Sequence, residues 1–386
     1  MKKLITLLSV LSISTSTGVS AVSCMPAQAD IKTDFSEDVG KNIDKSNAKD
    51  TSVDPSNYHG VSNFYTLGDS LSDNGGLVTI AKDELNANVV MTGQYKGGFS
   101  NGPRTAEIIN EKLGFKGISD KDSTFKSSNL IHKADIDYKD QKVWGRNYSV
   151  GGATAYESDG LAAKLLMGNT GIYKQAQALV QQQVIKEDDL FFLEIGGNDL
   201  FALAGVVDNV NAQTKIMNNA IENISNAFYT LLNNGAKKIV FASPPDITLT
   251  PGYNKRDKNY LAKVNLLCKE FDYKVTKVIE KLNSKFNNAI KTYNLYQELK
   301  NILNEFKGSN KNINITDHAC KSNAFDLGGL NIGGTIEIKA ELDNGVTEEN
   351  VNNYFFIDDV HPTKSGHEFV SKKIWDLLIS WNYISE

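Results

Sequence analysis

The chain has 386 residues, of which 40% are hydrophobic and 23% are charged. This composition is ordinary for a soluble globular protein, and the length is sufficient to bury a large core. The 41 Lys and Arg residues are outnumbered by 46 Asp and Glu residues, and the formal net charge of -5 gives no electrostatic basis for binding nucleic acid.

Residues 1–29 have the layout of a secretory signal peptide. Two lysines precede a short apolar stretch over residues 4–13, and small residues follow up to Ala21 and Ala29. The apolar stretch is too short to span a bilayer permanently, and cleavage after either alanine fits the pattern. A lipoprotein signal at Cys24 is the less favoured alternative. We therefore expect a secreted, periplasmic or cell-surface protein, and no later segment is apolar enough to predict a transmembrane helix.

The remainder of the chain divides into a lead-in and one domain. Residues 30–60 are rich in Asp, Lys, Asn and Ser, and such a stretch buries too little apolar surface to offset its ordering entropy. We expect a flexible polar lead-in there. Residues 61–386 form a single predicted domain, with an irregular Asn- and Gly-rich insertion at about 306–350.

Short apolar runs alternate with helical patterns along this domain. The predicted strands lie at 61–67, 143–150, 189–195, 238–242 and 289–295. The predicted helices lie at 105–113, 172–184, 212–233, 261–286 and 365–381. This alternation predicts a three-layer α/β/α fold in which helices cover both faces of a mainly parallel sheet.

Two candidate site segments follow predicted strands. In Gly68-Asp69-Ser70-Leu71, a glycine permits a tight turn and Ser70 then lies beyond the carboxyl end of a strand. Ligands of open α/β sheets bind at this edge, so Ser70 is a candidate nucleophile, although a lone serine there is more often a helix cap. Gly151 and Gly152 follow the next strand and can bring a backbone N–H close to a ligand.

Two further segments add complementary groups. Asn198 follows a strongly apolar strand, and its side-chain amide is a neutral donor suited to a developing oxyanion. Asp358 and His361 lie three residues apart on one turn, where the carboxylate can orient the imidazole as a general base. Each segment alone favours a structural role. The four segments in this order are much harder to explain structurally.

The four segments resemble the conserved blocks of the SGNH (GDSL) hydrolases, and the similarity covers about residues 62–385. It also includes the FSNGP segment at 99–103, and GAKK at 235–238 leading into SPP at 243–245. These secondary segments resemble the branch of secreted bacterial lipases, lysophospholipases and glycerophospholipid:cholesterol acyltransferases. The resemblance implies an SGNH hydrolase domain with a flavodoxin-like fold.

The resemblance also implies a role for each matching residue. Ser70 would be the nucleophile, His361 the general base and Asp358 its orienting carboxylate. The oxyanion hole would comprise the backbone N–H groups of Ser70 and Gly152 and the side chain of Asn198. The implied enzyme is a serine esterase or lipase, a (lyso)phospholipase A that can transfer acyl groups to an alcohol such as cholesterol. It needs no metal or organic cofactor, and its substrate would be a lipid or other acyl ester at a membrane surface.

Three other functions are the alternatives to this enzyme. A carbohydrate esterase (deacetylase) occurs on the same fold, and a catalytically silent surface binding protein would keep the fold without the chemistry. A metal-dependent phosphoesterase is disfavoured, because the five histidines of the chain are scattered and such sites need several histidine ligands at set positions.

Cysteine use adds one structural prediction. If Cys24 is removed or lipidated, Cys268 and Cys320 remain, and an oxidising compartment favours a disulfide between them. It would close a loop of about fifty residues and contribute on the order of 4 kcal/mol. We hypothesise that the insertion restricts access to the site until an activating protease cuts or displaces it.

Overall fold

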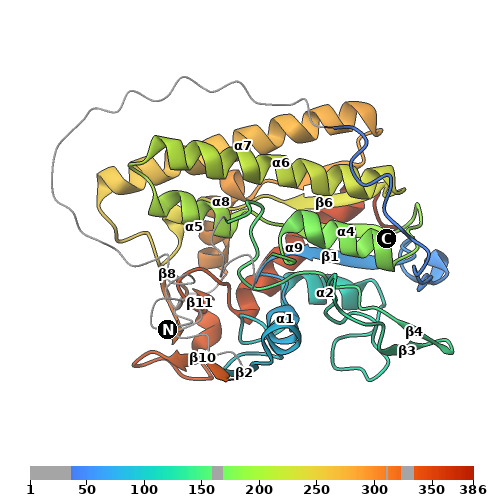
Figure 1. Cartoon of the computed structure of the whole chain (residues 1–386). Helices are drawn as coiled ribbons and strands as arrows, with labels where there is room; N and C mark the ends of the chain where they lie inside the picture. The colour runs from blue at the N-terminus through green and yellow to red at the C-terminus, as the bar shows by residue number, and fades with distance from the viewer. Residues whose placement is uncertain (1–35, 159–167, 310–311, 323–333) are drawn as a thin grey trace.

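The computed structural model of the chain describes residues 36–158, 168–309, 312–322 and 334–386 (Figure 1). The strands are β1 (Phe64–Gly68), β2 (Asn88–Thr92), β3 (Ile136–Tyr138), β4 (Gln141–Val143), β5 (Leu190–Glu194), β6 (Lys238–Ala242), β7 (Ile290–Tyr293), β8 (Asn314–His318), β9 (Cys320–Ser322), β10 (Thr335–Leu342) and β11 (Tyr354–Phe356). The helices are α1 (Gly76–Leu85), α2 (Thr105–Lys112), α4 (Ile172–Gln182), α5 (Gly197–Gly205), α6 (Val210–Asn233), α7 (Lys258–Lys285), α8 (Leu295–Gly308) and α9 (Lys364–Ser380), with 3-10 turns η1 (Pro55–Asn57), η2 (Ile247–Leu249) and η3 (Val351–Asn353). The predicted signal peptide and Cys24 lie outside the described residues.

The central sheet has the order β1-β5-β6-β7, and every neighbouring pair in it is parallel. The second half of the predicted strand 143–150 runs beside β1. There the backbone N–H of Tyr148 donates to the carbonyl of Thr66 at 2.8 Å, and that of Val150 donates to Gly68 at 3.1 Å. Because all these segments run the same way, the residues that follow them are delivered to one edge of the sheet.

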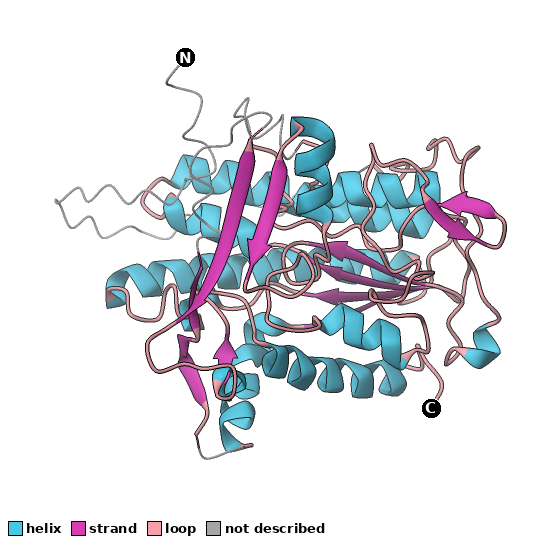
Figure 2. Ribbon diagram, turned by 90° about the horizontal axis from the view of Figure 1, so that it is seen from below, coloured by secondary structure: helices cyan, strands magenta, loops and turns pink. Residues whose placement is uncertain are grey.

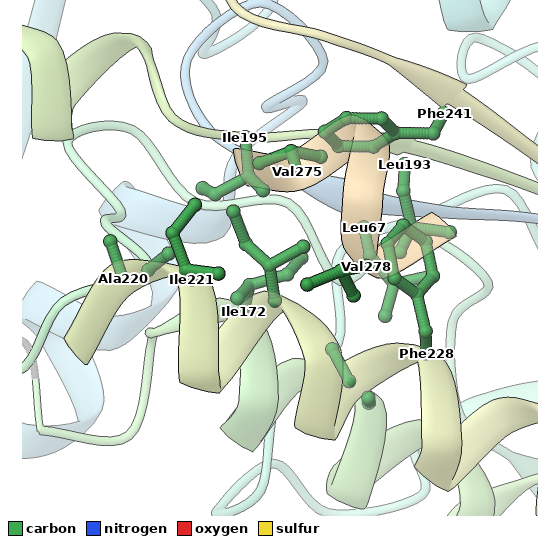
Figure 3. Close-up of a cluster of buried hydrophobic side chains, with 14 of the residues drawn as sticks. Leu67, Ile172, Leu193, Ile195, Ala220, Ile221, Phe228, Phe241, Val275 and Val278 are labelled. Atoms are coloured by element: carbon green, nitrogen blue, oxygen red, sulfur yellow. The ribbon is translucent and has the colours of Figure 1, made fainter. Parts of the chain in front are cut away.

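Helices cover both faces of this sheet, so the predicted three-layer α/β/α fold is confirmed. On one face, α4, α5, α6 and α7 pack on side chains such as Leu67, Leu193 and Phe241 (Figures 1 and 3). On the other face, α2, α8 and α9 pack on Phe64 and Phe192. Figure 2 shows helices on both sides of the central strands. Each large apolar side chain buried in this way contributes about 1.5–3 kcal/mol.

Part of the expected flexible lead-in is docked on the domain. The backbone N–H of Lys49 donates to the carbonyl of Gln182 at 2.9 Å, and Thr51 is completely buried. Val53 and Tyr58 pack against the second apolar cluster. The low apolar content of residues 30–60 suggested flexibility, but a few hydrogen bonds and apolar anchors are enough to hold residues 49–58, because the domain supplies the rest of the surface.

The insertion is more regular than we expected over residues 306–350. Its described parts contain β8, which pairs in parallel with β11, and β10, which pairs with β2 and β9. The strict polar–apolar alternation within Thr335–Leu342 is a strand signal that the Asn- and Gly-rich composition around it masks. Residues 310–311 and 323–333 lie outside the described residues.

The predicted disulfide is wrong, because both cysteines are free thiols in the structure. Cys268 is buried in α7 within the large core cluster. Cys320 is buried in a separate small cluster beside Ile357, and its thiol contacts the carbonyl of that residue at 3.0 Å. The spacing along the chain and the expected compartment suggested a bridge, whereas packing places the two sulfurs in different clusters.

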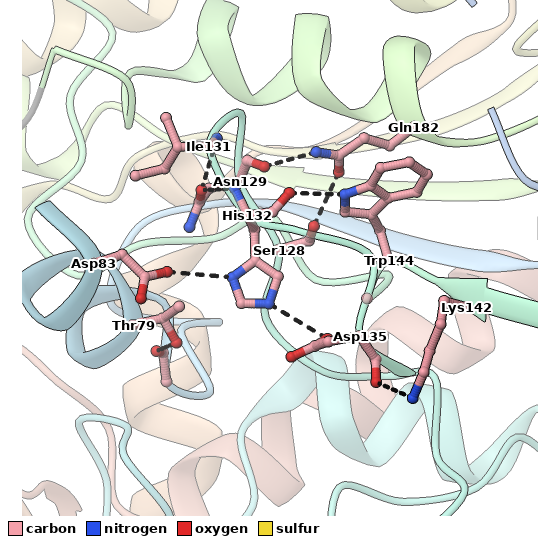
Figure 4. A network of polar contacts seen from close by, with 12 residues as sticks. Thr79, Asp83, Ser128, Asn129, Ile131, His132, Asp135, Lys142, Trp144 and Gln182 are labelled. Carbon is pink, nitrogen blue, oxygen red and sulfur yellow. Dashed lines mark hydrogen bonds and ion pairs between the residues drawn. The ribbon is translucent and has the colours of Figure 1, made fainter. Parts of the chain in front are cut away.

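His132 ties a long connection to α1. His132 faces Asp83 of α1 at 3.7 Å and Asp135 at 3.5 Å, and its carbonyl accepts a hydrogen bond from the indole of Trp144 (Figure 4).

Among the described helices, none combines the length and the apolar character needed to cross a bilayer.

Candidate active site

Ser70, His361 and Asp358 form a continuous hydrogen-bonded chain. The hydroxyl Oγ of Ser70 lies 2.6 Å from Nε2 of His361, and Nδ1 of the same ring lies 2.8 and 2.9 Å from the two carboxylate oxygens of Asp358. His361 and Asp358 are buried, whereas Ser70 is partly exposed. A segment near the start of the domain and one near its end, 291 residues apart, therefore meet.

The nucleophile turn follows directly from the end of β1. The N–H groups of Ser72 and Asp73 both donate to the carbonyl of Asp69, which closes a tight turn around Ser70. The last strand residue, Gly68, is fixed by Gln175 of α4, whose side chain accepts its N–H at 2.7 Å and donates to its carbonyl at 2.8 Å. These hydrogen bonds fix the backbone both before and after Ser70.

The turn after β11 holds the imidazole. One oxygen of Asp358 also accepts the backbone N–H groups of Val360 and His361, at 3.0 and 2.8 Å. Burial raises the pKa of Asp358, but the nearby His361 and these hydrogen bonds outweigh burial, so the pKa lies below its ordinary value. An ionised carboxylate only accepts hydrogen bonds, so Nδ1 of His361 carries the proton and Nε2 is free to accept the Ser70 hydroxyl.

The two other predicted donors lie on loops that are fixed to the same edge. Gly152 is exposed and has φ of 79°, a left-handed conformation that favours glycine. Asn198, in the first turn of α5, donates from Nδ2 to the carbonyl of Ala153 at 2.9 Å. An amide carries two hydrogens, so this bond orients the group and leaves a second N–H for another acceptor.

Two buried aspartates hold these loops in place. Asp73 accepts the N–H of Gly151 at 2.6 Å and three N–H groups at the start of α1. Asp199 accepts the N–H groups of Ala155 and Tyr156 at 2.9 and 2.7 Å. Burial raises the pKa of both carboxyls, to about 6 for Asp199. No motif around Asp73 or Asp199 predicted these roles, although Asp73 precedes a helix in the manner of an N-cap residue.

Two more carboxyls lie beneath the nucleophile, at the ends of neighbouring strands. Asp69 follows β1 and Glu194 ends β5, and both are buried. Burial raises the pKa of Asp69, and burial together with the charge of Asp69 raises the pKa of Glu194 well above its usual range. Two buried carboxyl groups at the ends of neighbouring strands disfavour simultaneous ionisation.

The other histidines of this region do not join the chain of hydrogen bonds. His367 is buried in α9, and its Nδ1 accepts the backbone N–H of Thr105 at 3.2 Å. His318 faces Asp343 at 2.8 Å. Within the ranges that the structure describes, no group of three or more His, Cys, Asp or Glu side chains is arranged to hold a metal ion.

Comparisons with known proteins agree with this geometry. Residues 64–374 match the model of the GDSL-like lipase/acylhydrolase family. The chain is 25% identical to GDSL esterase/lipase 6 of Arabidopsis thaliana over 348 residues, which cover 81% of this chain and 86% of that protein. It is 22% identical to GDSL esterase/lipase At1g29670 of the same plant, with the same coverage. It is also 25% identical to Lipase 1 of Photorhabdus luminescens over 51% of this chain and 24% of that protein.

The family match spans most of the folded domain, from the first residue of β1 into α9. It includes the serine turn, both loops with candidate donors and the turn with the imidazole. The resemblance seen in the sequence is thereby confirmed. The chain belongs to the GDSL-like lipase/acylhydrolase family.

Proposed function

We propose that this protein is an exported serine hydrolase that cleaves acyl esters of lipids through an acyl-serine intermediate. The observation that carries the proposal is the hydrogen-bonded chain from Ser70 through His361 to Asp358, with 2.6 Å between Ser70 Oγ and His361 Nε2. This is the arrangement that activates a serine hydroxyl as a nucleophile.

In the proposed mechanism, Ser70 attacks the ester carbonyl while His361 takes the hydroxyl proton at Nε2. Asp358 keeps its hydrogen bond to Nδ1 and stabilises the imidazolium that forms. The backbone N–H groups of Ser70 and Gly152 and the amide of Asn198 donate to the oxyanion. His361 then gives its proton to the leaving alcohol, and the acyl group remains on Ser70. Water, activated by the same imidazole, releases the fatty acid.

The finer proposal concerns the substrate. We propose phospholipids and lysophospholipids as acyl donors, and an alcohol such as cholesterol as an acceptor that competes with water. The names of the relatives, esterase/lipase and lipase, support acyl esters of lipids as the substrate class. The FSNGP segment at 99–103 supports the branch of secreted bacterial lipases, lysophospholipases and acyltransferases. Export rests on the signal-peptide pattern of residues 1–29, and activation by a protease remains a prediction.

The test uses purified mature protein with phospholipid, lysophospholipid and an acetylated sugar, each with and without cholesterol and with a chelator. We expect chelator-insensitive release of fatty acid, and cholesteryl ester when cholesterol is present. A fluorophosphonate probe should label the wild type and the control Ser380→Ala, whose serine is exposed on α9, but not Ser70→Ala.

Other outcomes overturn the proposal in distinguishable ways. Release of acetate alone would identify a deacetylase. An absence of both labelling and hydrolysis would indicate a binding protein without catalysis. Release of fatty acid without cholesteryl ester would remove only the acyl-transfer part of the proposal.

A further inference from the structure

The aromatic ring of Phe99 lies against one face of the His361 imidazole. The two ring centroids are 5.3 Å apart and the planes are inclined by 25°, which is a stacked arrangement. The Phe99 side chain is only 5% exposed. It comes from the FSNGP segment between β2 and α2, a segment to which the proposed mechanism gives no role.

The Cε2–Cζ edge of the Phe99 ring lies against the backbone of Gly151. A Cβ atom built on Gly151 would lie 2.6 Å from Cζ of Phe99, with Cε2 closer still, so no side chain fits there while the ring keeps its position. Gly151 itself is held by the bond from its N–H to Asp73. The Phe99 ring therefore contacts both the imidazole of His361 and the loop that carries Gly152.

The segment around Phe99 is anchored at both ends. The hydroxyl of Ser100 donates to the carbonyl of Pro362, next to His361, at 2.9 Å. The N–H of Tyr95 donates to the carbonyl of Ser100 at 2.8 Å, and the buried guanidinium of Arg104 donates to the carbonyl of Tyr95 at 3.0 Å. The ring is consequently held on the imidazole by the surrounding hydrogen bonds as well as by its own packing.

We infer that Phe99 is a positioning residue for the general base. It fills the space into which the imidazole of His361 would turn, and so keeps Nε2 at hydrogen-bond distance from Ser70 throughout the reaction. Its face also attracts the imidazolium that forms in the transition state. The same ring sets the spacing between the base and the loop of Gly152. This inference rests on the proposed hydrolase function.

The first test replaces Phe99 by leucine, which lacks the Cε2 and Cζ atoms and the aromatic face. We expect kcat to fall by about 10- to 100-fold with little change in KM, since small misplacements of catalytic groups have effects of this size. The rate of fluorophosphonate labelling of Ser70 should fall in parallel. The matched control is Phe228→Leu, which removes a fully buried ring of α6 in the large core cluster, where it packs edge-on against Phe241. It should reduce stability and leave kcat unchanged.

A second test separates positioning from general packing. Gly151→Ala should lower kcat in the wild type, because the added methyl group displaces the Phe99 ring from its stacked position on His361. In the Phe99→Leu background the same change should cost much less, because the two contacting ring atoms are gone. Such non-additivity identifies direct coupling between the two sites.

The outcomes distinguish the two proposals. If the wild type hydrolyses no ester and is not labelled, the proposed function fails. If the wild type is active and Phe99→Leu retains its kcat, the positioning role is overturned. Equal losses from Gly151→Ala in both backgrounds would also overturn it.

Discussion

The carboxylate of Asp73 joins the turn that carries Ser70 to the loop that carries Gly152. Its Oδ1 accepts the N–H of Gly75 at 2.7 Å, and its Oδ2 accepts the N–H of Gly151 at 2.6 Å. The two segments are 78 residues apart in the chain. Because one buried side chain accepts hydrogen bonds from both segments, it sets the distance between the proposed nucleophile and a proposed oxyanion donor.

The variant Asp73→Asn tests this connection. The amide replaces one acceptor oxygen by a donor that faces backbone N–H groups, so we expect the free energy of unfolding to fall by about 1–3 kcal/mol. We also expect kcat to fall, since Gly151 is released. Urea unfolding and ester hydrolysis measure the two effects. Asp83→Asn, an exposed position on α1, is the control, and an unchanged kcat in Asp73→Asn would limit Asp73 to a structural role.

Asp358→Asn should lower kcat by on the order of 10⁴-fold with little effect on KM, because the amide favours the wrong imidazole tautomer. Asparagine retains an oxygen for the N–H groups of Val360 and His361, so the turn should survive. The neighbouring variant Asp359→Asn is the matched control, because that side chain is more than half exposed. Steady-state kinetics of both variants decide the assignment, and a larger loss in Asp359→Asn would reverse it.

Asn198→Ala should lower kcat by about 10²–10³-fold, the cost of removing one oxyanion donor, while KM stays nearly constant. Asn223→Ala is the matched control. Its Nδ2 donates to the carbonyl of Ala155 at 2.8 Å, much as Asn198 donates to Ala153, but it offers no donor to the oxyanion. A kcat loss of similar size in both variants would show that only the shape of the loop matters.

The buried His367 predicts a pH-dependent stability. Burial, followed by the charges of Arg104 and His361, lowers its pKa from 6.5 to about 3. The unfolded chain therefore binds a proton that the folded chain does not bind between these values. The contribution of neutral His367 to the free energy of unfolding is therefore complete above pH 6.5. It is lost as the pH falls toward 3, by up to about 1.4 kcal/mol per pH unit.

The variant His367→Asn keeps an acceptor for the N–H of Thr105 and removes the titration. Relative to this variant, the wild type should lose free energy of unfolding between pH 7.5 and pH 5. Urea unfolding at the two pH values measures the difference, with His59→Asn, an incompletely buried histidine, as the control. A difference that does not change with pH would contradict the neutral state of His367.

The two thiols should be free and unreactive in the native protein. Burial raises the pKa of Cys268 and of Cys320 to about 12, which suppresses the reactive thiolate. We expect iodoacetamide to label both residues only after unfolding, and reductant to leave the melting temperature unchanged. Mass spectrometry of peptides with both residues oxidised in one bridge would contradict this expectation.

Sequence patterns were sufficient where the information is local. The alternation of apolar runs and helical spacings predicted the layered fold, because burial on one or two faces leaves a period in the sequence. Ser70 and Asn198 follow strands of the central sheet, and parallel strands deliver such residues to one edge of the sheet. Asp358 and His361 were indicated by their spacing of three residues on one turn. These candidates could therefore be named before any contact between them was known.

Tertiary structure alone decided which distant groups are partners. No period in the sequence pairs Asp73 with Gly151, stacks Phe99 on His361 or separates Cys268 from Cys320, because local patterns record whether a side chain is buried and not what it is buried against. The packing of helices on the sheet sets those distances. That packing, and not the motifs, brings the imidazole of His361 to hydrogen-bond distance from the hydroxyl of Ser70.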